Sequence, residues 1–108
     1  MLSSTYPSVF FFQSLMRHVS MKINDKPIDT TVDCIHNHLK QIEVTNYSGK
    51  ISDVNFAKYF VLNARVLESM NLHIPFSSHN KWRTKQRKMM NLINRASPNA
   101  RVHFEGSD

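Results

Sequence analysis

Residues 63–74, NARVLESMNLHI, run from a helical pattern straight into an alternating one, with no glycine or long loop between the two. The segment LKQIEV (residues 39–44) aligns with LESMNL (residues 67–72) at an offset of 28 positions, and the first, fourth and sixth residues of both segments are apolar. A period of 20–29 residues with this core is typical of leucine-rich repeats, which contain one strand and one helix per unit. The pattern therefore predicts an α/β fold, a short leucine-rich-repeat-like solenoid with parallel strands and helices on one face.

Two other stretches fit the repeat less well. Residues 16–23, MRHVSMKI, place apolar residues in a similar order 23 positions before the first copy. Residues 100–104, ARVHF, alternate near the position where a third spacing of 28 would place a strand. We expect each stretch to add a further parallel strand.

Three helices are expected between these strands. The first is a short turn or helix that ends at Asn37 and takes Asp29, Thr30 or Thr31 as its cap. Ser52 is the expected cap of the second helix, whose capping box is incomplete because Asn55 stands where Glu or Gln is usual. The apolar face of that helix consists of Val54, Ala57, Phe60, Val61 and Ala64. The third helix is expected to run from Ser78 to Pro98 and to turn inward Trp82, Met89, Ile93 and Ala96, flanked by Met90 and Leu92.

Length and cysteine content limit the class of protein. A chain of 108 residues forms one domain at most, and we assign residues 25–108 to it. Residues 1–24 are then a remnant of a preceding repeat or an irregular N-terminal segment. The single cysteine, Cys34, has no intrachain partner, and no basic residue precedes Arg17 in the N-terminal stretch. We therefore expect no signal peptide and no membrane span, and an intracellular location in the nucleus or cytoplasm.

The centre of the chain resembles the FBD domain found at the C-terminus of many plant F-box leucine-rich-repeat proteins. The residues that carry the likeness are Cys34, His38-Leu39-Lys40, Tyr47, Gly49 and the run FAKYFVLNARVLESM (residues 56–70). Downstream, HNKWRTKQRKMMNLINRAS (residues 79–97) and the strand that follows look like the tail of the family. The likeness extends over about residues 25–105.

The resemblance implies a non-enzymatic protein-interaction module. In such proteins an F-box binds the Skp subunit of a cullin-type ubiquitin ligase, and the repeats with the FBD domain face the protein substrate. No F-box-like segment occurs in these 108 residues. The partner expected here is an unidentified protein substrate, with a Skp-type adaptor only if an F-box is present upstream. We expect a C-terminal fragment, a truncated gene product or a relic of the recognition half.

The residues between the buried strand positions form the first candidate site. In L-x-x-L-x-L units these residues point to the concave side, along which repeat proteins commonly bind. The tentative protein-binding set is Gln41, Glu43, Thr45, Ser69, Asn71, His73, Arg101 and His103. His18, Ser20, Lys22 and Asn99 occupy the matching positions of the outer strands. The alternative interpretation is a polar sheet face that meets only water.

The basic segment KWRTKQRK is the second candidate. Between His79 and Arg101 there are seven Lys and Arg residues and no acid, in a chain of net charge +6. On a helix this predicts an anion-binding face of Lys81, Lys85, Arg87 and Lys88, which would suit the phosphate backbone of nucleic acid or an acidic protein. The simpler interpretation is a solvated outer helix that keeps the protein soluble.

Cys34, His36 and His38 alternate in a way that would converge on an extended chain, and zinc prefers such ligands. A fourth ligand would have to come from His73, His79 or His103. We expect instead that Cys34 packs as a small apolar residue and that the histidines cap backbone groups or face solvent. No catalytic residue, no metal site and no cofactor are predicted.

Overall fold

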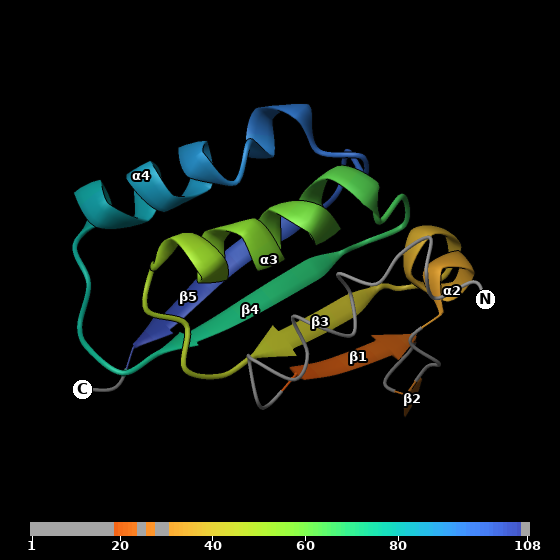
Figure 1. Cartoon of the computed structure of the whole chain (residues 1–108), viewed down its shortest axis with the longest axis horizontal. Coiled ribbons are helices and arrows are strands. Elements are labelled where there is room, and N and C mark those ends of the chain that lie inside the picture. The colour runs from red at the N-terminus through yellow and green to blue at the C-terminus, as the bar shows by residue number, and fades with distance from the viewer. Residues whose placement is uncertain (1–18, 24–25, 28–30, 107–108) are drawn as a thin grey trace.

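The structure, a computed structural model, describes residues 19–23, 26–27 and 31–106. The elements are β1 (Val19–Ile23), β2 (Lys26–Pro27), α2 (Val32–Asn37), β3 (Gln41–Val44), α3 (Ile51–Asn63), β4 (Ser69–Ile74), α4 (Asn80–Met89), the 3₁₀ turn η2 (Leu92–Asn94) and β5 (Arg101–Gly106). The strands form one sheet in the order β2-β1-β3-β4-β5. Helices α3 and α4 lie over the same face of this sheet (Figure 1).

Strands β3, β4 and β5 are parallel, as the repeat predicts. Ile42 lies opposite Met70, so the two segments that are 28 residues apart form neighbouring rungs. Met70 in turn lies opposite Val102, which is 32 positions further on. The expected third strand is therefore confirmed, with a longer connection than the repeat predicts.

The expectation of a parallel strand over residues 16–23 is wrong in its direction. β1 pairs with β3 in the antiparallel sense, with Val19 opposite Val44 and Lys22 opposite Gln41. This strand therefore cannot be another rung of a parallel solenoid. The structure does not confirm the solenoid character that the repeat predicts. Residues 16–18, including His18, lie outside the described residues, as do Asp29 and Thr30. The sheet contains residues on both sides of position 24, and the domain boundary expected there stays a prediction.

Backbone hydrogen bonds explain the tight junction between α3 and β4. Both the Glu68 and the Ser69 N–H groups donate to the Lys40 carbonyl, at 2.8 and 3.1 Å. These bonds start the β3–β4 ladder immediately after the helix. Leu67 is fully buried at the junction. With a glycine or a polar loop at this junction, the apolar side chain of Leu67 would no longer be buried there. The register of β4 against β3 would then be less well defined.

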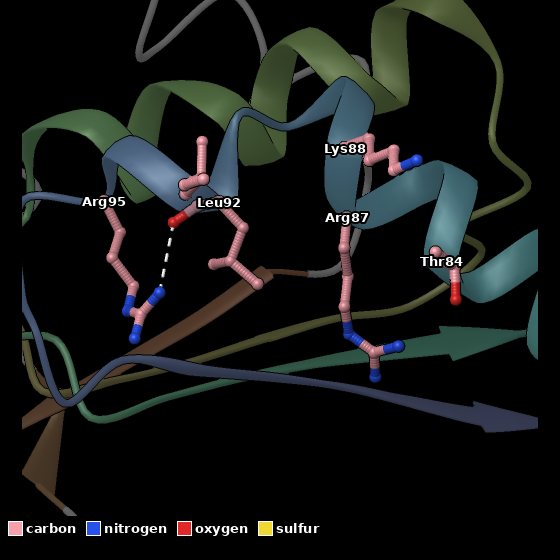
Figure 2. A pocket seen from close by; sticks show the side chains of 6 residues that line it. Thr84, Arg87, Lys88, Leu92 and Arg95 are labelled. Carbon is pink, nitrogen blue, oxygen red and sulfur yellow. Dashed lines mark hydrogen bonds between the residues drawn. The ribbon is translucent and has the colours of Figure 1, made fainter.

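Helix α4 ends earlier than its sequence pattern predicts. Asn91 has a left-handed backbone with φ 61°, which stops the helix and starts η2 beside it (Figure 2). The change of phase turns Ile93 outward, where it is 87% exposed, so its expected place in the core is wrong. Gln86 and Met90 are buried instead. Ser78 does not cap the helix, because His79 occupies the cap position and the Ser78 hydroxyl accepts a bond from Arg83.

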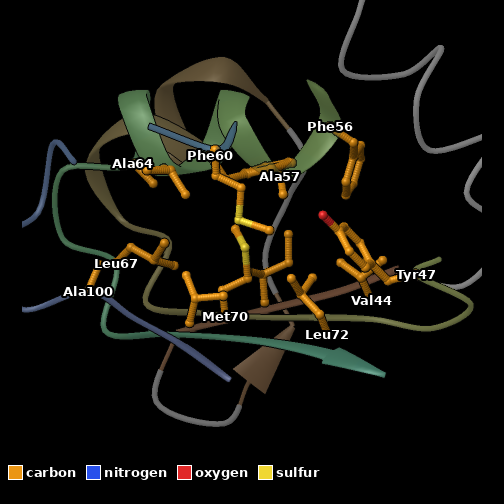
Figure 3. Close-up of a cluster of buried hydrophobic side chains, with 14 of the residues drawn as sticks. Val44, Tyr47, Phe56, Ala57, Phe60, Ala64, Leu67, Met70, Leu72 and Ala100 are labelled. Atoms are coloured by element: carbon orange, nitrogen blue, oxygen red, sulfur yellow. The ribbon is translucent and has the colours of Figure 1, made fainter. Parts of the chain in front are cut away.

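Helix α3 buries the apolar face that its spacing predicts. All five expected residues are buried, and Figure 3 shows Ala57 and Phe60 directed toward Met70 and Leu72 of the sheet. The expected cap is wrong, since the helix begins at Ile51 and Ser52 is exposed.

Asp53 organises the start of α3. The buried carboxylate accepts the Ser48 backbone N–H at 2.8 Å, the Ser48 hydroxyl at 2.9 Å and the Lys50 N–H at 3.4 Å. Asp53 stands at the third helical position, where a capping box places its acidic or amide residue.

The turn before α3 is fastened to α4. The buried Tyr47 hydroxyl donates to the Gln86 side-chain oxygen at 2.6 Å. Burial, followed by the negative charge of Asp53, raises the pKa of Tyr47, so the phenol stays a proton donor at physiological pH. Gly49 has φ 86°, and a Cβ there would lie 3.0 Å from the Trp82 ring. The turn therefore requires glycine to seat α4 against the sheet.

Candidate protein-interaction surface

All of the predicted binding residues except Thr45 lie on strands β3, β4 and β5, on the open face of the sheet opposite α3 and α4. The alternation of a strand places every second side chain on this face. Pairing puts Gln41, Ser69 and Arg101 in a first row, Glu43, Asn71 and His103 in a second, and His73 beside Glu105 in a third. These side chains are half-buried or exposed, whereas those between them on β3 and β4 are buried.

His73 is the centre of an ionic row on the open face. Its Nε2 lies 3.4 Å from a carboxylate oxygen of Glu43, and its Nδ1 lies 3.5 Å from one of Glu105. Glu105 is absent from the predicted set, because apolar alternation ends at Phe104 while β5 continues to Gly106. The face thus carries two carboxylates around an imidazole.

The opposite end of the open face is cationic. Lys22 of β1 lies opposite Gln41, and Arg101 closes the same row on β5. Thr45 follows the end of β3 and is half-buried, while Asn99 is exposed in the segment before β5. A partner that covers all three rows meets cations at one end and carboxylates at the other, which favours one orientation of binding.

The basic helix faces solvent with its lysines only. Lys81, Lys85 and Lys88 are exposed, and no ion pair within the described ranges involves them. Arg87 is turned inward, donates to the Val102 carbonyl at 3.1 Å and lies over the Phe104 ring at 5.1 Å. The predicted anion-binding set is therefore divided between three free lysines and an arginine attached to β5.

Cys34 and His36 lie on helix α2, and His38 follows as its C-cap, so the assumption of an extended chain is wrong. Helical residues two positions apart point in different directions. His36 Nε2 lies 2.9 Å from the Tyr59 hydroxyl, which joins α2 to α3. In the part of the chain that the structure describes, no three His, Cys, Asp or Glu residues form a group suited to a metal ion.

The position of His36 predicts a pH dependence of stability. Burial, followed by the positive charge of Arg65, lowers the pKa of His36 from 6.5, although Asp33 opposes this shift. The unfolded chain then binds a proton more readily, so His36 should contribute its full stability above pH 6.5 and lose it as the pH falls below that value. Urea unfolding of wild type and His36→Gln between pH 5 and 7.5 measures the contribution.

His38→Gln is the matched control, because His38 is exposed at the end of the same helix. This variant should keep the pH slope that His36→Gln reduces. Parallel profiles for wild type and His36→Gln would contradict the assignment.

Together, the sheet, its covering helices and its polar open face define a small α/β domain with a surface suited to protein contacts. Residues 26–72, just under half of the chain, match the family model described as FBD. The predicted resemblance to the FBD domain, which is associated with F-box proteins, is confirmed over these residues. The match ends within β4, so the likeness expected for residues 79–105 stays a prediction.

The search of curated proteins and the search of solved structures each found no match. Among the described residues, no helix has the length and apolar character needed to cross a bilayer.

Proposed function

We propose that this chain is a non-enzymatic protein-interaction module that binds its partner on the open face of the sheet. The observation that carries the proposal is the register of β3, β4 and β5, which brings polar side chains from three strands into adjacent rows. Parallel strands hold these side chains on a rigid scaffold, because their reverse side is sealed by the core. Such a surface loses little conformational entropy when it binds.

The FBD match supports a more specific version of the proposal. We propose that the domain serves the substrate-recognition region of a plant F-box ubiquitin-ligase adaptor. The three parallel strands would then act as leucine-rich-repeat-like rungs, with Ile42 and Met70 as equivalent positions. Contact with a Skp-type adaptor belongs to this proposal only for a longer protein in which an F-box precedes these residues.

Quantitative affinity capture tests the proposed face. The full chain is immobilised and exposed to plant extract beside two variants of equal charge change. Asn71→Glu alters the centre of the open face, where the side chain is half-buried between Glu43 and His103. Asn80→Glu alters an exposed position at the start of α4 on the opposite side. The amount of each specific partner captured should fall at least about tenfold with Asn71→Glu. A misplaced charge at an interface weakens binding by about 1.4 kcal/mol or more.

Partners captured by Asn80→Glu should match those of wild type. Thermal unfolding of all three proteins verifies that folding is unchanged. Equal capture by wild type and Asn71→Glu would refute binding on the open face, whatever the identity of the captured proteins.

A further inference from the structure

The helical side of the molecule carries a second concave surface, which we call the α4–η2 groove. It has a volume of about 450 Å³ and is lined by Thr84, Arg87, Lys88, Leu92, Ile93 and Arg95. The groove exists because the left-handed Asn91 folds η2 back beside α4 (Figure 2). Ile93, at 87% exposure, is the most exposed large apolar residue in the described chain. The groove thus combines an aliphatic surface with three cations.

No ion pair among the described residues offsets the positive charge of the groove. No Asp or Glu occurs from residue 79 to residue 104. The ion pairs found in the described segments use Asp33, Glu43, Glu68 and Glu105, and none of them involves a cation of the groove. A groove with aliphatic residues and unpaired cations is complementary to an acidic segment that also presents an apolar side chain.

Both guanidinium groups of the groove are held in place before any ligand arrives. Arg95 donates from Nε and Nη2 to the Pro98 carbonyl, at 3.2 and 3.1 Å, and from Nη1 to the Leu92 carbonyl at 3.3 Å. Arg87 is fixed between the Val102 carbonyl and the Phe104 ring. Binding therefore orders mainly Lys88, which reduces the entropic cost.

We propose that the α4–η2 groove binds an acidic, amphipathic peptide segment of a partner protein. Ile93 and Leu92 would contact the apolar residue of that segment, and Lys88, Arg87 and Arg95 would attract its carboxylates. The aromatic residues around α4 favour a peptide over a nucleic acid, because Trp82 packs edge-to-face against Phe76 and Phe104 and is not available as a base-stacking platform. This surface lies on the side opposite the open sheet face, so the proposal is independent of the function proposed above.

Fluorescence anisotropy with a labelled peptide EELLEELL and the full chain tests the groove. We expect saturable binding that weakens with added salt and is at least about tenfold weaker for QQLLQQLL. Lys88→Glu should weaken binding about tenfold, because it reverses one of the exposed charges of the groove. Ile93→Ser should weaken it about fivefold, since an isoleucine side chain contributes apolar burial on contact.

Two control variants distinguish binding in the groove from nonspecific effects of charge or of exposed apolar residues elsewhere. Lys22→Glu makes the same charge change on the open sheet face, and Ile51→Ser removes another exposed isoleucine. Both should bind EELLEELL within about twofold of wild type. Equal weakening by Lys22→Glu and Lys88→Glu, or no binding at all, would overturn the proposal. A labelled eight-nucleotide single-stranded DNA that binds more tightly than EELLEELL, and is insensitive to Ile93→Ser, would overturn it in favour of nucleic acid.

Discussion

Replacing Asp53 by alanine should lower the free energy of unfolding by about 2–4 kcal/mol. The carboxylate is 3% exposed and is the acceptor for two N–H groups and one hydroxyl at the start of α3. Its removal leaves the partly buried Ser48 donors without that acceptor and frees the turn that carries Tyr47. The total free energy of unfolding of a small domain is about 5–15 kcal/mol. The loss should therefore appear as a large shift in the urea midpoint.

Asp33→Ala is the matched control, because Asp33 also lies in the first turn of a helix but its side chain is 76% exposed. Its hydrogen bond to Asn37 should be worth less than about 1 kcal/mol. Asp53→Asn should fall between wild type and Asp53→Ala, since an amide keeps one acceptor oxygen. Equal losses for Asp53→Ala and Asp33→Ala would show that the buried carboxylate does not organise the turn.

The arrangement of β3 and β4 could be predicted because their apolar residues recur at one offset and both strands must be buried. Ile42 and Met70 are consequently neighbours. The direction of β1 could not be predicted in this way, because alternation shows which side chains share a face and carries no information on strand direction. The outward position of Ile93 depends on the left-handed backbone of Asn91. The helical spacing of apolar residues shows no interruption at this position, so the sequence pattern does not predict the turn.

The open face was largely predictable from the strand period alone. Positions between buried residues must point to the other side of a sheet, and this rule places Glu43, Asn71 and His103 in one row. The contact between His73 and Glu105 was missed, since the end of β5 has no apolar residue to mark it. The inward turn of Arg87 was missed as well, because it depends on Phe104 and the Val102 carbonyl, which are distant in the sequence.

Replacing Phe60 by alanine should lower the free energy of unfolding by about 3–5 kcal/mol. Phe60 is 1% exposed and joins an aromatic cluster on α3, with ring centroids 5.0 Å from Phe56 and 5.3 Å from Tyr59. Its side chain fills the layer between the helix and the parallel strands (Figure 3), so truncation leaves a cavity that the sheet cannot close. Urea unfolding monitored by circular dichroism measures the loss.

Ile51→Ala provides the control on the same helix, because Ile51 is 70% exposed and should change stability by less than about 0.5 kcal/mol. If Phe60→Ala is too unstable to measure, Phe60→Leu keeps most of the volume and should cost about 1–2 kcal/mol. If the Phe60 variants lower the free energy of unfolding no more than Ile51→Ala does, α3 does not seal the sheet. The open face and the α4–η2 groove would then lack the common core that holds them on opposite sides of one domain.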